Sequence, residues 1–189
     1  MLAGGRSTRF GRDKLAEPYR RMPLLHHAVL RLAEICREMI VVIAPDRTDP
    51  ALPRGVPVRV VHDATEGEGP LAGLVAGLSA ARNDLALVAG GDMPHLQTPV
   101  LLELMRIVRE GPVAGVALGE GSSFRPLPCA LRTEAATDAA HTLLEAGRRS
   151  LRELLQALRL MVIDEPTWRA LDPEGLTLYD VDVPEDLRP

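Results

Sequence analysis

The sequence has few of the features that mark several large classes of protein. Only two of its 189 residues are cysteines, Cys36 and Cys129, and they show no CxxC or Cys/His spacing, so no structural zinc site is expected. Aromatic residues make up only 3%, which leaves few side chains for stacking on bases, and the net charge of -4 is unsuited to neutralising phosphates. Both observations disfavour nucleic-acid binding. No apolar run reaches about 18 residues, so no membrane span is predicted. We therefore expect a cytoplasmic protein.

The remaining composition is ordinary for a globular domain, with 46% hydrophobic and 25% charged residues. Short apolar runs alternate with segments of helical spacing, and this alternation predicts a three-layer α/β fold around a mostly parallel, mixed sheet. The expected strands are 39–44, 56–61, 85–89, 113–118, 127–131, 160–163 and 176–181. The expected helices are 24–36, 71–81, 98–108, 133–146 and 151–158, with Thr98 and Ser150 as N-caps and Gly147 ending the fourth.

The length predicts a single domain over residues 1–189, because no linker, repeat or low-complexity tract divides the chain. Only Met1 and Leu2 precede the glycine-rich segment that begins at Ala3. In folds of this class such a segment follows the first central strand, and two residues are too few for one. Either the first strand is truncated in this sequence and starts upstream, or the sheet is built in an unusual way; we expect the former.

The first glycine-rich segment, LAGGRSTRFGRDK, has the composition of a phosphate-binding loop. Gly4 and Gly5 allow a backbone whose N–H groups converge on an anion. Ser7 adds a hydroxyl donor, and Arg9 and Lys14 add the positive charge that a triphosphate requires. Lys14 is expected to be exposed in the absence of substrate. The alternative is a glycine turn followed by a solvated basic loop, since the segment matches neither a Walker A loop nor GxGxxG.

Two acidic groups predict a site for a divalent cation. Asp92 follows the apolar run 85–89 in the motif GGDMP, and open α/β sheets bind ligands at the carboxyl ends of their strands. Asp180 and Asp182 are two residues apart, so in an extended strand both side chains face the same side. Mg²⁺ takes one or two protein carboxylates together with phosphate oxygens, and we expect Asp92 and Asp182 as its ligands. Aspartates that cap turns are the alternative for both groups.

A third segment suits a nucleotide base or phosphate. Asp63 ends a predicted strand and can accept hydrogen bonds from N1–H and N2–H₂ of guanine. The loop EGEGPLAG follows and ends at a helix N-terminus, where free N–H groups and the helix dipole favour an anion or a base edge. We therefore expect Gly69, Pro70 and Leu71 to contact the nucleotide.

Together these segments resemble the molybdenum cofactor guanylyltransferases, within the wider group of MobA-like nucleotidyltransferases. LAGGRSTRFGRDK is similar to the family's LAGGxSxRMGxDK, EGPLAGL to its GPLAG loop and GDMP to its DMP motif. RPLPCALR, GRRSLRELL and DVDVPEDL also follow its pattern, so the resemblance spans nearly the whole chain. It implies a Rossmann-like nucleotidyltransferase fold, GTP and Mg²⁺ as cosubstrates, and transfer of GMP to the terminal phosphate of molybdopterin that carries molybdenum.

The resemblance also implies roles for individual residues. Those that would contact the nucleotide or metal by position are Leu2, Ala3, Gly4, Gly5, Lys14, Asp63 and Asp92. Arg9, Lys14 and Asp92 are expected to promote the transfer. Arg125 and Asp180 are expected to contact the acceptor.

Some positions depart from the family's usual pattern. Asp180 and Asp182 stand where the guanylyltransferases commonly have Asn, and Phe10 stands in place of Met. These residues are similar to the cytidylyltransferase branch, whereas the segments AGG and GPLAG favour guanine. The alternatives to guanylyl transfer are therefore a cytidylyltransferase, a sugar-nucleotide pyrophosphorylase or an inactive nucleotide-binding protein.

Overall fold

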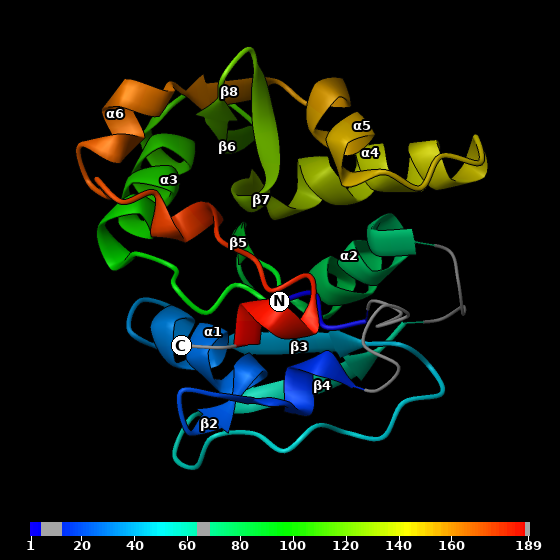
Figure 1. The fold of residues 1–189 in the computed structure, drawn as a ribbon. Helices are drawn as coiled ribbons and strands as arrows, with labels where there is room; N and C mark the ends of the chain where they lie inside the picture. Colours follow the sequence, from blue (N-terminus) through cyan, green and yellow to red (C-terminus); the bar gives the residue numbers. More distant parts are fainter. Residues whose placement is uncertain (5–12, 64–68, 188–189) are drawn as a thin grey trace.

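The fold is a mixed β-sheet between two layers of helices, given by a computed structural model that describes residues 1–4, 13–63 and 69–187 (Figure 1). The strands are β1 (Pro18–Tyr19), β2 (Met22–Pro23), β3 (Met39–Ile43), β4 (Val58–His62), β5 (Leu85–Val88), β6 (Gly115–Glu120), β7 (Ser123–Arg132) and β8 (Leu160–Ile163). The helices are α1 (Leu24–Ala33), α2 (Gly69–Ala80), α3 (Thr98–Glu110), α4 (Thr133–Glu145), α5 (Leu151–Ala157) and α6 (Glu165–Arg169). Short 3-10 helices are η1 (Lys14–Ala16), η2 (Leu176–Leu178) and η3 (Pro184–Leu187).

The main sheet consists of two parts that meet at the first residues of the chain. β3 and β4 pair in parallel, and β5, β7, β6 and β8 form the second part in that order. Leu2 makes parallel bridges to Val42 of β3 and to Gly90 just after β5. β7 runs antiparallel to both of its neighbours, whereas β6 and β8 are parallel. This arrangement confirms the predicted mixed and mostly parallel sheet.

Each face of the sheet has its own apolar core. Helices α1 and α3 cover one face, where Val29, Leu101 and Leu104 are fully buried. Helices α2, α4 and α5 cover the other face, with Leu74 and Leu154 in the core. A strand covered on both sides is apolar throughout, which explains the continuous apolar run of β3. Among the helices in the described ranges, none has the length and apolar character that crossing a bilayer requires.

Most helix ends follow their predicted signals. Ser150 caps α5 by accepting a hydrogen bond from the N–H of Arg152, and Gly147 follows α4 with φ of 76°. The N-cap predicted for α3 is wrong by one residue, because the helix already includes Thr98 and the cap position is Gln97. The hydroxyl of Thr98 instead donates to Glu34 Oε2 at 2.6 Å, which joins α3 to the end of α1.

The predicted strand 176–181 does not form. Its first residues make the 3-10 helix η2 instead, after a left-handed Gly175. The reason is the buried carboxylate of Asp172, which accepts hydrogen bonds from the N–H groups of Leu176 at 3.1 Å and Thr177 at 2.7 Å. These bonds satisfy backbone donors that a strand would offer to a neighbour, and they hold the chain in a turn.

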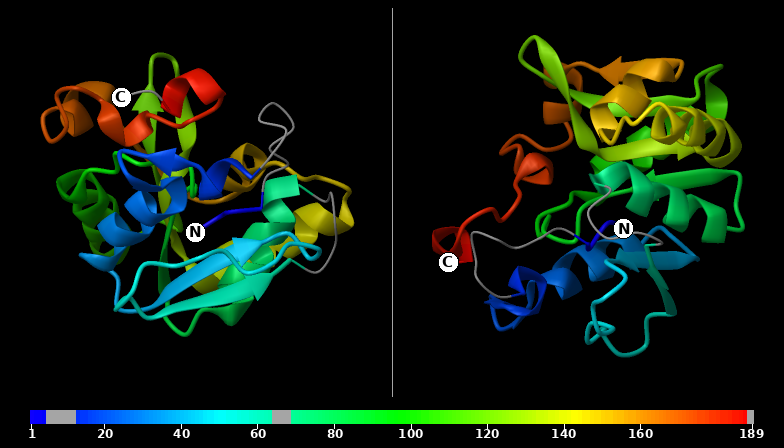
Figure 2. Two further views of the ribbon diagram at one scale, coloured as in Figure 1. Left: turned by 60° about the horizontal axis from the view of Figure 1, so that its bottom comes forward. Right: turned by 90° about the vertical axis from the view of Figure 1, so that its right-hand side faces the viewer.

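The last part of the chain packs against its beginning. Val181 is fully buried in a small cluster with Tyr19 of β1 and Leu24 of α1. Figure 2 shows this from two sides, with the red C-terminal turn η3 beside the blue β1–β2 hairpin. The segment that follows η2 is thereby brought to the carboxyl end of β5, where the candidate site lies.

Candidate functional site

Three segments that are far apart in the sequence meet around the side chain of Lys14. Its Nζ donates hydrogen bonds to Asp92 Oδ2 at 2.7 Å and to the carbonyl oxygen of Val181 at 2.8 Å. The same nitrogen lies 3.9 Å from Asp182 Oδ1. The side chain of Lys14 is only 16% exposed, so the expectation of an exposed lysine is wrong. It is held inward because acceptors from two other segments surround it.

Asp92 is positioned by the loop that follows β5. The N–H of Gly91 donates to the carbonyl oxygen of Leu2 at 2.9 Å, which ties this loop to the centre of the sheet. The carbonyl oxygen of Asp92 accepts from the N–H of Val181 at 3.0 Å. A Cβ at Gly90 would collide with Asp92 Oδ1, so the carboxylate occupies space that only glycine leaves open. The loop therefore sets both the place and the direction of the Asp92 side chain.

The C-terminal segment contributes two more carboxylates with different partners. Asp180 receives hydrogen bonds of 3.3 Å on both of its oxygens from the guanidinium of Arg125 on β7. Asp182 is 58% exposed and faces Lys14. The two side chains are therefore not paired along a strand, as the spacing predicted, because that strand does not form.

The charges around Asp180 oppose one another. Burial raises the pKa of Asp180 above its ordinary value, and the nearby carboxylates of Asp182 and Asp92 raise it further. The guanidinium of Arg125 acts in the opposite direction and lowers this pKa. Three carboxylates thus share a small region with two cationic side chains, Lys14 and Arg125. A bound cation would relieve the repulsion among these carboxylates.

The described residues include no ready-made metal site, since no group of three or more His, Cys, Asp or Glu side chains among them could hold a metal ion. Asp92 and Asp182 nevertheless both contact the ammonium of Lys14, at 2.7 and 3.9 Å. Mg²⁺ commonly takes one or two carboxylates and fills its other positions with phosphate oxygens and water. This pair fits an ion that arrives with a nucleotide.

Of the predicted nucleotide-binding residues at the start of the chain, Leu2 and Ala3 lie within the sheet. The N–H of Ala3 donates to the carbonyl oxygen of Val42 at 2.8 Å, and the Ala3 side chain is buried. A Cβ at Gly4 would be 3.3 Å from the backbone nitrogen of Ala44, so the chain passes close to the end of β3 here. Gly5, Ser7 and Arg9 lie outside the described residues.

Asp63 and the start of α2 form the other side of the predicted nucleotide site. The N–H of Asp63 donates to the carbonyl oxygen of Ile43 at 2.8 Å, and its Oδ2 would be 3.6 Å from a Cβ placed on Gly73. Asp63 therefore lies at the end of β4 against α2. Pro70 is exposed, whereas the side chain of Leu71 is fully buried in the core, so Leu71 has only its backbone to offer a ligand.

The first residue of α2 contacts a distant basic segment. Gly69 has a φ of 79°, which favours glycine. A Cβ at this position would lie 3.2 Å from both the Cβ and the carbonyl oxygen of Arg149. The beginning of α2 is thus packed against the segment that connects α4 and α5.

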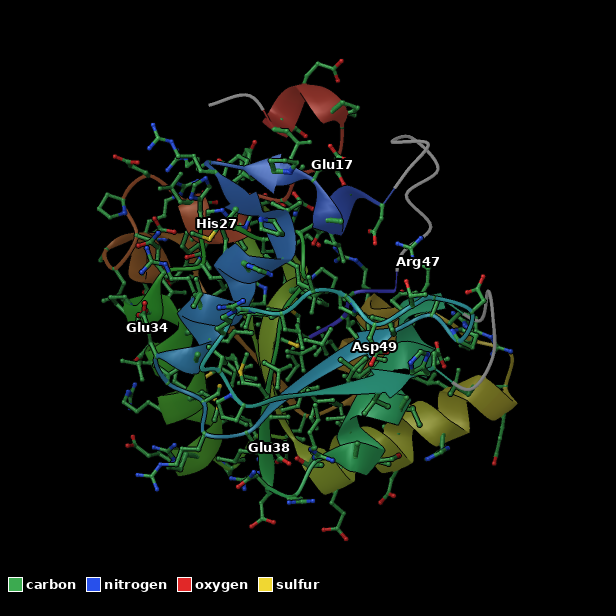
Figure 3. All side chains as sticks on the ribbon, turned by 90° about the horizontal axis from the view of Figure 1, so that it is seen from below. Glu17, His27, Glu34, Glu38, Arg47 and Asp49 are labelled. Atoms are coloured by element: carbon green, nitrogen blue, oxygen red, sulfur yellow. The ribbon has the colours of Figure 1, made fainter. Side chains whose placement is uncertain are left out.

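The connection between β3 and β4 also reaches the site. Arg47 pairs with Asp13 at 2.8 Å, and Asp13 in turn accepts a hydrogen bond from the N–H of Leu15 in η1. Figure 3 labels Arg47 on this connection, close to the start of η1. These contacts hold the segment that carries Lys14 over the end of the β3–β4 part of the sheet.

An aromatic cluster behind the site was not apparent from the sequence. The hydroxyl of Tyr19 lies 2.6 Å from Nε2 of His95, and the rings of His95 and Tyr179 are 5.5 Å apart. Burial lowers the pKa of His95, and the charges of nearby cationic groups lower it further. No local spacing in the sequence relates His95 to these two tyrosines, because each lies more than 70 residues away from it. The cluster joins the C-terminal segment to the loop of Asp92.

Comparison with family models matches residues 1–161 to the MobA-like NTP transferase domain. A relative from Chloroflexus aggregans, named a probable molybdenum cofactor guanylyltransferase, is 32% identical over 201 residues that cover 100% of this chain and 90% of the relative. A molybdenum cofactor guanylyltransferase from Pseudomonas fluorescens is 33% identical over 162 residues, covering 84% of this chain and 78% of the relative.

Solved structures share the fold. Molybdopterin-guanine dinucleotide biosynthesis protein A from Archaeoglobus fulgidus superposes with a TM-score of 0.79 at 20% identity, covering 98% of this chain and 92% of that protein. The 2-C-methyl-D-erythritol 4-phosphate cytidylyltransferase from Thermus thermophilus gives a TM-score of 0.71 at 14% identity, covering 98% and 93%. These likenesses confirm the predicted Rossmann-like α/β architecture.

Proposed function

Since the chain belongs to the MobA-like NTP transferase family, we propose that it transfers GMP from GTP to the phosphate of a molybdopterin-type acceptor, with Mg²⁺ as cofactor and release of pyrophosphate. The names of its relatives support this nucleotide and this acceptor. The observation that carries the proposal is the meeting of Lys14, Asp92 and Asp182, which places a cation and two carboxylates together.

The reaction joins two anions, so its barrier is largely electrostatic. An oxygen of the acceptor phosphate attacks the α-phosphorus of GTP and forms a new P–O bond. The bond from that phosphorus to the oxygen bridging the α- and β-phosphates breaks, and its electron pair leaves with pyrophosphate. The attacking oxygen is already a nucleophile, so no strong general base is needed. The protein must instead neutralise charge and hold the two phosphates in line.

Lys14 and Asp92 can supply this neutralisation by exchanging partners. They compensate one another across 2.7 Å. With GTP bound, the ammonium of Lys14 would turn to phosphate oxygens, and Asp92 together with Asp182 would hold a Mg²⁺ ion. Bound Mg²⁺ would withdraw charge from the phosphates and favour departure of pyrophosphate. Arg9 belongs to the same proposal as a further cation for the triphosphate.

The two ends of the site suit different substrates. Asp63 at the end of β4 has two carboxylate oxygens, which match the two donors on the guanine edge. Arg125 presents a planar fork that suits a phosphate of the acceptor, and Asp180 is positioned to orient it through their 3.3 Å contacts.

A second candidate is cytidyl transfer on the same machinery. The aspartates at positions 180 and 182 favour it, because they are similar to those of cytidylyltransferases rather than to the usual Asn. Cytosine has no equivalent of guanine N1–H, so the carboxylate of Asp63 would have to make different hydrogen bonds with CTP than with GTP.

Pyrophosphate release, measured with molybdopterin and each of GTP, CTP, ATP and UTP, tests the proposal. We expect turnover with GTP, its loss on chelation with EDTA and its recovery when Mg²⁺ is added. Asp63→Asn should lower kcat/KM for GTP roughly 10- to 100-fold, the range for a hydrogen bond to a charged group. A preference for CTP would replace the first candidate by the second. Nucleotide binding without pyrophosphate release under any condition would contradict both.

A further inference from the structure

The loop that carries Asp92 and the C-terminal segment are joined at two places. At one of them the N–H of Val181 donates to the carbonyl oxygen of Asp92 at 3.0 Å. At the other the rings of His95 and Tyr179 lie 5.5 Å apart, centre to centre. Asp92 and His95 are three residues apart and Tyr179 and Val181 are two apart, so the two contacts close a small ring of chain. Asp182 follows directly on this ring.

The chain between η2 and η3 belongs to no strand or helix, so no ladder of backbone hydrogen bonds fixes its place. The hydroxyl of Tyr179 donates to the carbonyl oxygen of Asp186 at 3.1 Å, and Asp186 Oδ2 accepts from the N–H of Asp182 at 2.8 Å. These two bonds fix the shape of the turn. Its place relative to Asp92 depends instead on the contacts of Tyr179 and Val181 with the loop after β5.

The imidazole of His95 is anchored by Tyr19, whose hydroxyl lies 2.6 Å from Nε2 of His95. The rings of Tyr19 and His27 lie 5.2 Å apart in an edge-on arrangement, and Nε2 of His27 lies 2.7 Å from the carbonyl oxygen of Tyr19. Figure 3 labels His27 on α1, beside the β1–β2 hairpin. Because its side chain is buried and held from several directions, Tyr19 gives His95 a fixed support.

An imidazole can hold two neighbours at once, because it has a polar edge and an aromatic ring. The nitrogen at its edge bonds a hydroxyl either as acceptor or as donor. Its ring packs against another aromatic ring, and such pairs add to the stabilisation from buried area. His95 makes the first contact with Tyr19 and the second with Tyr179. It thereby links a buried support to the segment that leads to Asp182.

We propose that His95 is a positioning residue for the transfer reaction and acts on the carboxylate of Asp182. Held by Tyr19, its imidazole keeps the segment from Tyr179 to Asp182 in place. The position of Asp182 relative to Asp92 is set in this way. This role rests on the proposed function, in which the two carboxylates hold Mg²⁺. Since Mg²⁺ demands near-ideal octahedral geometry, a displaced carboxylate lowers the rate of transfer.

His95→Ala removes both contacts of the imidazole and tests this role. We expect kcat for pyrophosphate release to fall about 10- to 100-fold, because a misplacement of about 1 Å can cost about 100-fold. KM for the nucleotide should change by less than about 3-fold, since the base is proposed to bind at Asp63, on the other side of the site. In His95→Gln the amide can still bond the hydroxyl of Tyr19, so at least about a third of the wild-type kcat should return.

Two controls separate positioning from a general loss of stability. His141→Ala removes an exposed histidine on α4, which is the same chemical change at a different place. Val108→Ala shortens a fully buried side chain near the end of α3 and should lower Tm by several degrees. Both controls should keep kcat within about 2-fold of wild type, because they lie outside the site. All variants are assayed at a temperature at which CD shows them folded.

A double-variant cycle tests whether His95 acts through Asp182. Asp182→Ala removes the carboxylate, and once it is absent its placement no longer affects the rate. Adding His95→Ala to Asp182→Ala should therefore lower kcat by no more than about 3-fold further, instead of the 10- to 100-fold expected in the wild-type background. A histidine that only stabilises the fold would lower kcat by the same factor in both backgrounds.

Hydrogen exchange measured without nucleotide tests the placement of the segment directly. The amide of Val181 is the donor to Asp92, so its exchange should become at least about 10-fold faster in His95→Ala. In His141→Ala it should keep the wild-type rate. This measurement uses neither GTP nor molybdopterin, so its outcome is distinct from that of the transfer assay.

Three results would each overturn the proposal. They are a wild-type kcat in His95→Ala, the same loss of kcat with and without the carboxylate of Asp182, and an unchanged exchange rate at Val181. If the wild-type chain releases no pyrophosphate from any nucleotide, the proposed function fails and the role in transfer fails with it. The exchange rates then still show whether His95 holds the C-terminal segment.

Discussion

Lys14 and Asp92 are 78 residues apart in the sequence, yet Nζ of the lysine lies 2.7 Å from Oδ2 of the aspartate. The two side chains are 16% and 27% exposed, so water screens their attraction only in part. In the proposed reaction this contact would open, so that the lysine could bind phosphate and the aspartate could bind Mg²⁺. The pair therefore contributes both to the stability of the fold and to the proposed chemistry.

Lys14→Ala is expected to reduce kcat by about 100- to 1,000-fold, because it removes a preorganised positive charge from the reacting phosphates. It should also destabilise the fold by about 1–3 kcal/mol, since Asp92 loses its partner while remaining half-buried. Steady-state pyrophosphate release and urea unfolding measure the two effects. Arg31→Ala is the control, because the Arg31–Glu34 pair is exposed and should contribute no more than about 0.5 kcal/mol. Wild-type turnover in Lys14→Ala would remove the lysine from the mechanism.

Gly90→Ala is expected to lower transfer activity at least about 10-fold while the protein still folds, because the added methyl group displaces the carboxylate of Asp92. The neighbouring Gly91→Ala is the matched control. Its methyl group meets the terminal methyl groups of Leu25 and Leu15 at 3.0 and 3.4 Å, so it presses on two apolar side chains and not on the carboxylate of Asp92. Activities and CD spectra of the two variants are compared. Equal activities would show that Gly90 does not set the position of Asp92.

Arg125→Met is expected to raise the pKa of Asp180 further. Burial already raises this pKa, and Arg125 is the group that lowers it. Between the ordinary pKa of an aspartate and its raised pKa in the folded protein, the unfolded chain has already lost the proton that the folded protein still holds, so stability falls as the pH rises. The variant widens this interval and should therefore lose stability over a wider pH range. Carbon NMR titration of the Asp180 carboxyl group gives the midpoint, with Arg31→Met as the control. An unchanged midpoint in Arg125→Met would contradict the pairing.

The stability of the 189-residue chain with a free Met1 amine is expected to fall as the pH is lowered from 8 to 6. Burial lowers the pKa of this amine from 8.0 to about 6, so the unfolded chain takes up a proton in this range before the folded chain does. The difference of about two pKa units corresponds to a loss on the order of 2–3 kcal/mol. Urea unfolding at pH 6, 7 and 8 measures it.

Acetylation of Met1 is the control for this pH dependence, because it removes the titrating group. The slope of stability against pH between 6 and 8 should become smaller in the acetylated chain. If the free and acetylated chains show the same slope, the amine is not the group responsible.

The sequence determined the elements that depend on neighbouring residues. The run 160–163 forms β8 with the predicted bounds, and the apolar run from Met39 forms β3. Such strands can be predicted because burial on both faces requires successive apolar residues. The residue types of the site could also be predicted from short segments. A lysine that follows a glycine-rich loop suits a nucleotide, and an aspartate that follows a buried strand suits a metal ion.

Tertiary structure alone decided how these residues meet. The carbonyl oxygen of Val181 accepts from Lys14 across 167 residues, and every residue has such a carbonyl, so no sequence pattern marks it. The contact between Tyr19 and His95 likewise depends on how separate segments pack. The strand expected at 176–181 failed because the carboxylate of Asp172 competes for its backbone donors. Periodicity and propensity act over a few residues, whereas these contacts form only when distant segments come together in space.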